Sequence, residues 1–157
     1  MFNKPRSSLA LPVIGVLAGL GVGLPVLYFL EPLVLDPVVS PQAGQTIEDW
    51  LREFRQLETL LVILSVAVGL LWHASTFLDA GRSGDLRLVW VGLGILFLAF
   101  ACWMAVRRLP SVQEGSSGIM LCVAVNALLP YYMASAAFTV ASHKYAPWGS
   151  RALRKLW

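Results

Sequence analysis

The sequence predicts an all-α integral membrane protein with four transmembrane helices, because of its composition and its four long apolar stretches. Of the 157 residues, 57% are hydrophobic and only 13% are charged, whereas an ordinary soluble domain carries roughly 25% charged residues. The mean hydropathy is +0.70. Each apolar stretch has the length of about 20 residues that a helix needs to cross a bilayer. The connecting segments are too short for a separate soluble domain, so we expect one membrane domain over residues 1–157.

The first apolar stretch covers residues 9–30 and follows two basic residues, Lys4 and Arg6. A secretory signal also begins with basic residues, but its apolar region is only about 7–15 residues long. We therefore interpret the stretch as an anchor helix. It carries a stripe of glycines at i, i+4 and i+8, which allows another helix to approach closely: Gly15, Gly19 and Gly23. The pattern leaves open whether that helix belongs to the same chain or to another.

Residues 31–56 form the longest predicted loop, which we expect to be extracytoplasmic. Three prolines in its first half disfavour a regular helix: Pro32, Pro37 and Pro41. Thr46 and Asp49 then resemble a capping box with Asp in the usual Glu position, and apolar residues follow at helical spacing. We expect an extracytoplasmic amphipathic helix from about Thr46, which either lies at the outer surface or continues into the second span.

The remaining three spans are predicted at residues 57–78, 88–106 and 119–142. Glycine, proline and charged residues interrupt the apolar sequence at 79–87 and 107–118, as is typical of turns. We therefore expect the second and third spans, and the third and fourth, to form antiparallel hairpins.

The distribution of Lys and Arg predicts that both termini are cytoplasmic, because cytoplasmic loops carry an excess of these residues. With this orientation, eight of the 12 basic residues lie inside and four outside. The inside set is Lys4, Arg6, Arg82, Arg87, Lys144, Arg151, Arg154 and Lys155, and the outside set is Arg52, Arg55, Arg107 and Arg108. The short loops favour a bacterial inner membrane.

The tail at residues 143–157 is predicted to be cytoplasmic and to contain a short basic interfacial helix. Apolar residues recur at helical spacing and basic residues occupy the other face, a pattern that suits an anionic membrane surface. The residues assigned to this surface are Trp148, Arg151, Arg154, Lys155 and Trp157. We also interpret Trp50, Trp72, Trp90 and Trp103 as anchors near the membrane interfaces.

The fourth span combines small and polar residues. Its small-residue face comprises Ala127, Ala134, Ala137 and Ala141, and its polar residues include Asn126, Tyr131, Ser135 and Thr139. Pro130 removes a backbone hydrogen bond, so we expect a kink and a freed carbonyl at Asn126. The span is either a centrally packed helix or, together with His73 of the second span, the polar lining of a permeation path.

No cofactor, metal or catalytic residue is predicted. His73 and His143 lie on one side of the membrane, but no second ligand accompanies either on its helix, and Cys102 and Cys122 match no metal spacing. The serines lie in no hydrolase motif, and no glycine-rich phosphate loop is present. We expect a protein that is not an enzyme.

The leading hypothesis is a non-enzymatic structural or accessory subunit of a multi-protein inner-membrane assembly, such as a secretion, motor or respiratory-type complex. The alternative is a homo-oligomeric channel, pore-former or small transporter in which the fourth span lines the path. Expected partners are membrane lipids and either other membrane-protein subunits or copies of the chain itself. The net charge is +3, and the basic residues lie beside apolar spans. This position favours a membrane surface over nucleic acid as their binding partner.

Overall fold

The computed structural model describes residues 10–30, 46–78, 86–109, 117–138 and 147. These residues form four α-helices, α1 (Ala10–Pro25), α3 (Ile47–Leu78), α4 (Arg87–Arg108) and α5 (Ser117–Phe138), and one short π-helix, η1 (Val26–Leu30), which continues α1. No strand occurs among them. The all-helical class predicted from the sequence is confirmed for this part of the chain.

Three helices, α3, α4 and α5, are long and apolar enough to cross a membrane. The first predicted span, residues 9–30, corresponds to α1 and η1, where Val13–Phe29 form a shorter apolar helix. The membrane class is therefore supported by three helices, and the count of four spans stays a prediction. Residues 31–45, the last part of the fourth predicted span at 139–142, and the predicted tail helix lie outside the described residues.

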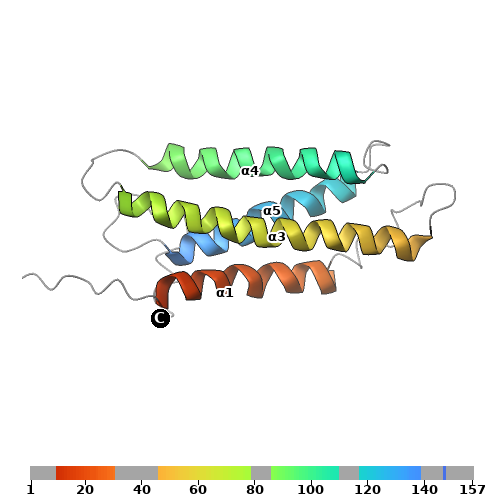
Figure 1. Cartoon of the computed structure of the whole chain (residues 1–157), viewed down its shortest axis with the longest axis horizontal. Helices are drawn as coiled ribbons and strands as arrows, with labels where there is room; N and C mark the ends of the chain where they lie inside the picture. The colour runs from red at the N-terminus through yellow and green to blue at the C-terminus, as the bar shows by residue number, and fades with distance from the viewer. Residues whose placement is uncertain (1–9, 31–45, 79–85, 110–116, 139–146, 148–157) are drawn as a thin grey trace, which may run out of the picture.

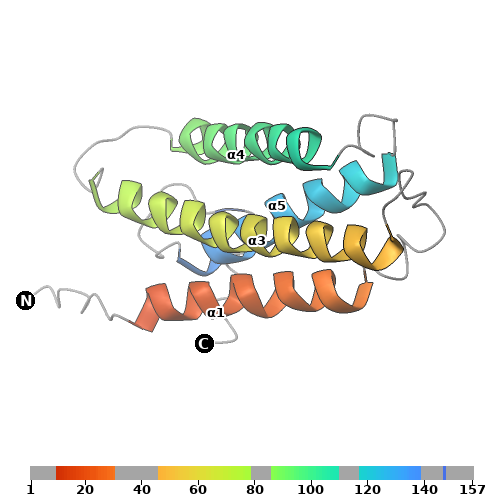
Figure 2. The same ribbon diagram turned by 45° about the vertical axis from the view of Figure 1, so that its right-hand side comes forward.

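The helices run in alternating directions along a common long axis, with α1 and α4 on opposite sides of α3 (Figures 1 and 2). The two predicted hairpins, α3 with α4 and α4 with α5, are therefore antiparallel. Helix α5 crosses behind α3 at a tilt and packs against α1, α3 and α4. It is the helix around which the bundle is assembled.

Helix α3 begins at the predicted capping residues and is continuous. Thr46 Oγ1 accepts a hydrogen bond from the backbone N–H of Asp49 at 3.1 Å and donates one to its carboxylate at 2.7 Å. The amphipathic segment and the second span form one helix of 32 residues, about 48 Å long. Because a hydrocarbon core is only about 30 Å thick, α3 is longer than a perpendicular span needs. Its first turns extend beyond the ends of α1 and α4 (Figure 1).

Three large apolar side chains near the start of α3 are buried. Trp50, Phe54 and Leu57 are each 1% exposed, and the rings of Trp50 and Phe54 stack at 5.2 Å. They share a core with residues of α4 and α5 and the residue that follows α4: Phe97, Ala101, Ala105, Leu109, Ile119, Cys122, Val123 and Ala127. We call this end of the bundle, where α3 begins, the α3 N-terminal end.

The interpretation of Trp50 and Trp72 as interfacial anchors is wrong. Both side chains are almost fully enclosed by protein, at 1% and 0% exposure, and an enclosed indole cannot contact lipid headgroups. Trp103, by contrast, is 54% exposed on α4. The error has a simple cause: position along a helix does not show which way a side chain faces.

The junction of α1 and η1 coincides with Pro25. A proline has no amide hydrogen and its ring crowds the carbonyl four residues earlier, so regular α-helical bonding is interrupted there. The following residues adopt the wider π-helical turn, a geometry that often marks such interruptions. The first predicted span is therefore not a uniform α-helix.

The glycine stripe of α1 lies against α3 and α5 of the same chain. A methyl group added at Gly19 would lie 2.6 Å from Val66 Cγ2 and 3.3 Å from the Pro130 carbonyl oxygen, and one added at Gly23 would lie 2.7 Å from Val62 Cγ1. Gly15 is also buried. Gly21, which lies off the stripe, would meet nothing within 4 Å. The described contacts of the stripe are thus within the chain.

The first prediction follows from this difference between two glycines of one helix. Gly19→Ala should lower the free energy of unfolding by about 1–3 kcal/mol, because Val66 is stiff at χ1 and the neighbouring contact is backbone. Gly21→Ala is the matched control and should leave stability unchanged or slightly higher. Thermal unfolding of the detergent-purified protein, followed by tryptophan fluorescence, measures both. Equal destabilisation by the two substitutions would contradict the packing face.

Candidate functional site

Most of the chemically distinctive side chains of the bundle converge on α5. Of the residues predicted on this helix, Asn126, Ala127, Tyr131, Ala134 and Ser135 are buried, and Ala137 is half-buried. Thr139, Ala141, Trp148, Arg151, Arg154, Lys155 and Trp157 lie outside the described residues, as does the side chain of His73, whose backbone belongs to α3. Asn126, Tyr131 and Ser135 therefore face the interior of the bundle.

One polar contact joins α3 to α5. The Ser65 hydroxyl donates a hydrogen bond of 2.7 Å to the backbone carbonyl of Ala127, and Ser65 is fully buried. Pro130 was expected to free the carbonyl of Asn126, and the carbonyl that Ser65 contacts belongs to the next residue, Ala127. This interhelical bond satisfies the buried Ser65 hydroxyl, which lipid could not do.

A second group of contacts joins α4 to α5, and we call it the Trp90 cluster. Tyr131 donates a hydrogen bond of 2.8 Å to the Trp90 carbonyl, and the Trp90 indole N–H donates one of 3.0 Å to the Ser135 hydroxyl. That hydroxyl in turn donates to the Tyr132 carbonyl at 3.1 Å. The Trp90 ring also stacks on Tyr131, with centroids 5.7 Å apart. Gly94, one turn after Trp90, leaves room for the Tyr131 ring.

The most unusual group in the bundle is Glu58 of α3, which the sequence analysis did not single out. Its side chain is 0% exposed, and none of the described residues hydrogen-bonds to either carboxylate oxygen. The Asn126 side chain of α5 approaches the carboxyl group, but not with normal hydrogen-bond geometry. A fully buried acid without a hydrogen bond is costly unless it is neutral or used for function.

A signal for Glu58 was present in the sequence. The buried face of α3 contains Phe54, Leu61 and Val62, which stand at i−4, i+3 and i+4 from Glu58 and therefore share its face of the helix. The helical spacing was followed from Trp50 through Phe54 to Leu57 at the start of the second predicted span, but Glu58, the next residue, was not compared with this face. Including Glu58 in the same helical pattern places it beside the apolar residues.

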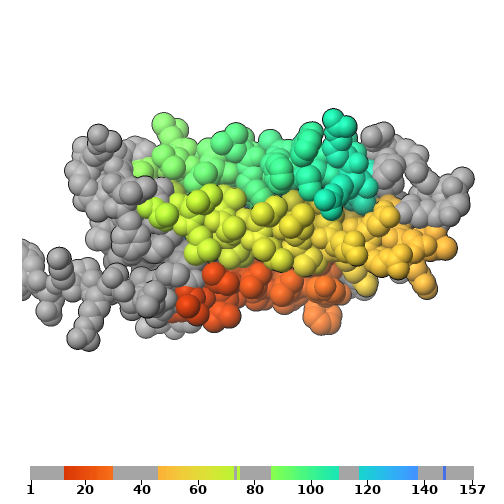
Figure 3. All heavy atoms as spheres, in the orientation of Figure 1, coloured from red at the N-terminus to blue at the C-terminus, as the bar shows by residue number. Residues whose placement is uncertain are grey.

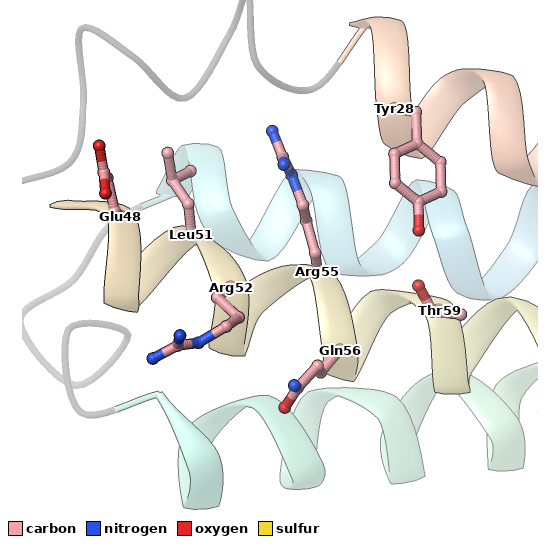
Figure 4. Close-up of a pocket in the computed structure, with 7 residues that line it drawn as sticks. All are labelled: Tyr28, Glu48, Leu51, Arg52, Arg55, Gln56 and Thr59. Atoms are coloured by element: carbon pink, nitrogen blue, oxygen red, sulfur yellow. The ribbon is translucent and has the colours of Figure 1, made fainter.

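A polar groove lies on the other side of α3, near the end of η1. It has a volume of about 720 Å³ and is lined by Tyr28, Glu48, Leu51, Arg52, Arg55, Gln56 and Thr59. Figure 4 shows the hydroxyl ends of Tyr28 and Thr59 facing one another, while Arg55 extends away from them. Arg52 is engaged with Asp49 at 2.6 Å. The groove is open, unlike the enclosed surroundings of Glu58.

The described residues contain few groups that could bind a metal or act in catalysis. No set of three or more His, Cys, Asp or Glu side chains within them is arranged to hold a metal ion. Cys102 of α4 and Cys122 of α5 are not in a disulfide within the described part of the chain. The candidate site is consequently the buried layer formed by Glu58 and Asn126, with Ser65 two turns along α3.

The chain was compared with known proteins at three levels. No protein family, no curated protein and no solved structure matches it.

Proposed function

We propose that this protein is a non-enzymatic structural or accessory subunit of a multi-protein inner-membrane assembly. The proposal rests on one observation: polar groups of α5 form hydrogen bonds with other helices of the same chain. Ser65 bonds to Ala127, and Trp90 is held by Tyr131 and Ser135. In a homo-oligomeric channel lined by this helix, those side chains would have to face a shared axis outside the protomer. Their burial supports packing over lining.

The outer face of α4 supports the same proposal, because α4 is the least buried of the three described helices that could cross a membrane. Only 22% of its most apolar stretch is buried, against 44% and 56% for α3 and α5. Figure 3 shows α4 along one edge of the molecule, beside α3. Large apolar side chains are exposed along it: Leu88, Val89, Val91, Ile95, Leu96, Phe100, Trp103 and Val106. Lipid or a partner helix covers such a face, and we assign it to the partner subunit.

The proposed setting is a bacterial inner membrane crossed four times, with both termini in the cytoplasm. It is supported by the excess of Lys and Arg in the predicted cytoplasmic segments and by the alternating directions of consecutive helices. In this orientation the α3 N-terminal end of the bundle, with its polar groove, faces the extracytoplasmic side. The basic tail contacts the cytoplasmic leaflet.

The packing role of the Trp90 cluster can be tested by removing one hydroxyl. Tyr131→Phe should lower the free energy of unfolding by about 0.5–1.5 kcal/mol, because the Trp90 carbonyl loses its side-chain donor while the ring contact remains. Tyr132→Phe, the neighbouring tyrosine, is the control and should have a smaller effect. Thermal unfolding in detergent compares the two. Altered ion flux through vesicles containing Tyr131→Phe, with stability unchanged, would instead favour a lining role.

The partner surface can be tested by photo-crosslinking in cells. A benzophenone amino acid at Leu96, which is 70% exposed on α4, should form adducts with another membrane protein. The same amino acid at Leu17, 63% exposed on α1, is the control for general lipid exposure. Mass spectrometry identifies the adducts. Lipid adducts alone at Leu96 would contradict the assignment, and adducts with this same chain would favour the homo-oligomer.

The orientation can be tested with an impermeant thiol reagent on intact cells. In a background where Cys102 and Cys122 are replaced by Ala, Gln42→Cys should be labelled from outside. Ser83→Cys should be labelled only after the membrane is opened, because residues 79–87 connect two spans on the cytoplasmic side. Labelling of Ser83→Cys in intact cells would reverse the proposed topology.

A further inference from the structure

Among the residues that the structure describes, none compensates a negative charge on Glu58. The neighbours on the same face of α3, Phe54, Leu61 and Val62, are at most 1% exposed. Asn126 of α5, which does not titrate, is the polar side chain that approaches the carboxyl group. The described residues of α1, η1 and α4 contribute no charged group to its surroundings, and neither does α3 itself.

The carboxyl group also lies well inside the bundle. Asn126 is nine residues after Ser117, the first residue of α5, which corresponds to about 13 Å along the helix. One turn further along α3, Val62 meets Gly23 of α1. Glu58 therefore lies in a layer enclosed by three helices, and its oxygens have no contact with solvent.

These facts distinguish the two protonation states of the acid. An ionised carboxylate in an apolar, unpaired position loses its hydration without gaining a partner, whereas the neutral acid loses far less. A neutral acid also has a hydroxyl that can donate to the Asn126 amide oxygen, and this pairing suits an acid facing an amide. Ionisable groups placed inside membrane bundles mark proton and ion sites more often than simple packing positions.

We propose that Glu58 is a proton-binding site, which holds its proton at neutral pH and shares it with Asn126. The site is separate from the packing contacts on which the proposed function rests. Its loss would leave the interaction with a partner subunit intact. A subunit with such a site can respond to proton uptake within the membrane, which a purely structural component does not do.

Dicyclohexylcarbodiimide is the probe, because it reacts with protonated carboxylic acids in apolar surroundings. The acid transfers its proton to one carbodiimide nitrogen, and its oxygen bonds to the central carbon. The acyl group then shifts to nitrogen and leaves a stable N-acylurea. Nothing is oxidised or reduced, and the adduct contains all the atoms of both reactants.

The experiment uses the full chain in detergent and maps the adduct by mass spectrometry. We expect labelling at Glu58 near neutral pH, a decline as the pH is raised, and loss of that adduct in Glu58→Gln. Glu48→Gln, on the exposed side of the same helix, is the matched control and should leave labelling unchanged. Unchanged tryptophan fluorescence and thermal unfolding show that Glu58→Gln is folded.

Two results would overturn the proposal. If folded wild-type protein is not labelled at Glu58 at any pH, the carboxyl group does not hold an exchangeable proton. If sodium chloride protects Glu58 but potassium chloride does not, the site binds a sodium ion in place of the proton. Asn126→Leu provides a further check, because loss of the shared hydrogen bond should shift the pH at which labelling declines, whereas a merely structural Asn126 would not move it.

Discussion

The close approach of α1 and α3 to α5 is the constraint on which the rest of the bundle depends. In a bilayer, moving an apolar side chain from lipid into a helix interface yields little free energy, because both environments are apolar. Helices therefore associate through tight packing and interhelical hydrogen bonds. Gly19 and Gly23 bring α1 against Val62, Val66 and Pro130, and Gly69 of α3 would place a methyl group only 2.8 Å from Ala134 Cβ. Larger residues at these positions would separate the helices and expose the polar layer between them.

This close approach explains how polar groups can lie inside so apolar a protein. Because α5 is central, its two sides meet different partners: Ser65 of α3 reaches the Ala127 carbonyl, and Trp90 of α4 is held by Tyr131 and Ser135. Each bond satisfies a group that would otherwise face hydrocarbon. Glu58 is the exception in this layer, since packing has enclosed its carboxyl group without supplying a hydrogen bond. That contrast is the reason to look for function at Glu58.

The bundle is also asymmetric toward its surroundings. Helix α5 is the more buried of the two, with 56% of its most apolar stretch buried against 22% for α4, and α4 presents a row of large apolar side chains outward. The groove near Tyr28 and Arg55 places polar groups at the α3 N-terminal end. A subunit that docks through α4 would keep its interior layer and its polar end unobstructed, so partner binding and protonation of Glu58 can occur together.

The sequence by itself determined the features that depend on neighbouring residues. Apolar length predicted four membrane spans, and three of the described helices are long and apolar enough to cross a membrane. The Thr46–Asp49 pair located the start of α3, and the spacing of Gly19 and Gly23 marked one face of α1. Tertiary structure alone decided the features that depend on which faces meet. Trp50 lies in the core, and Ser65 of α3 bonds to the carbonyl of Ala127 on α5. Glu58 is buried because other helices, among them α5 with Asn126, cover the face of α3 on which it stands, and no local pattern specifies what covers a helix.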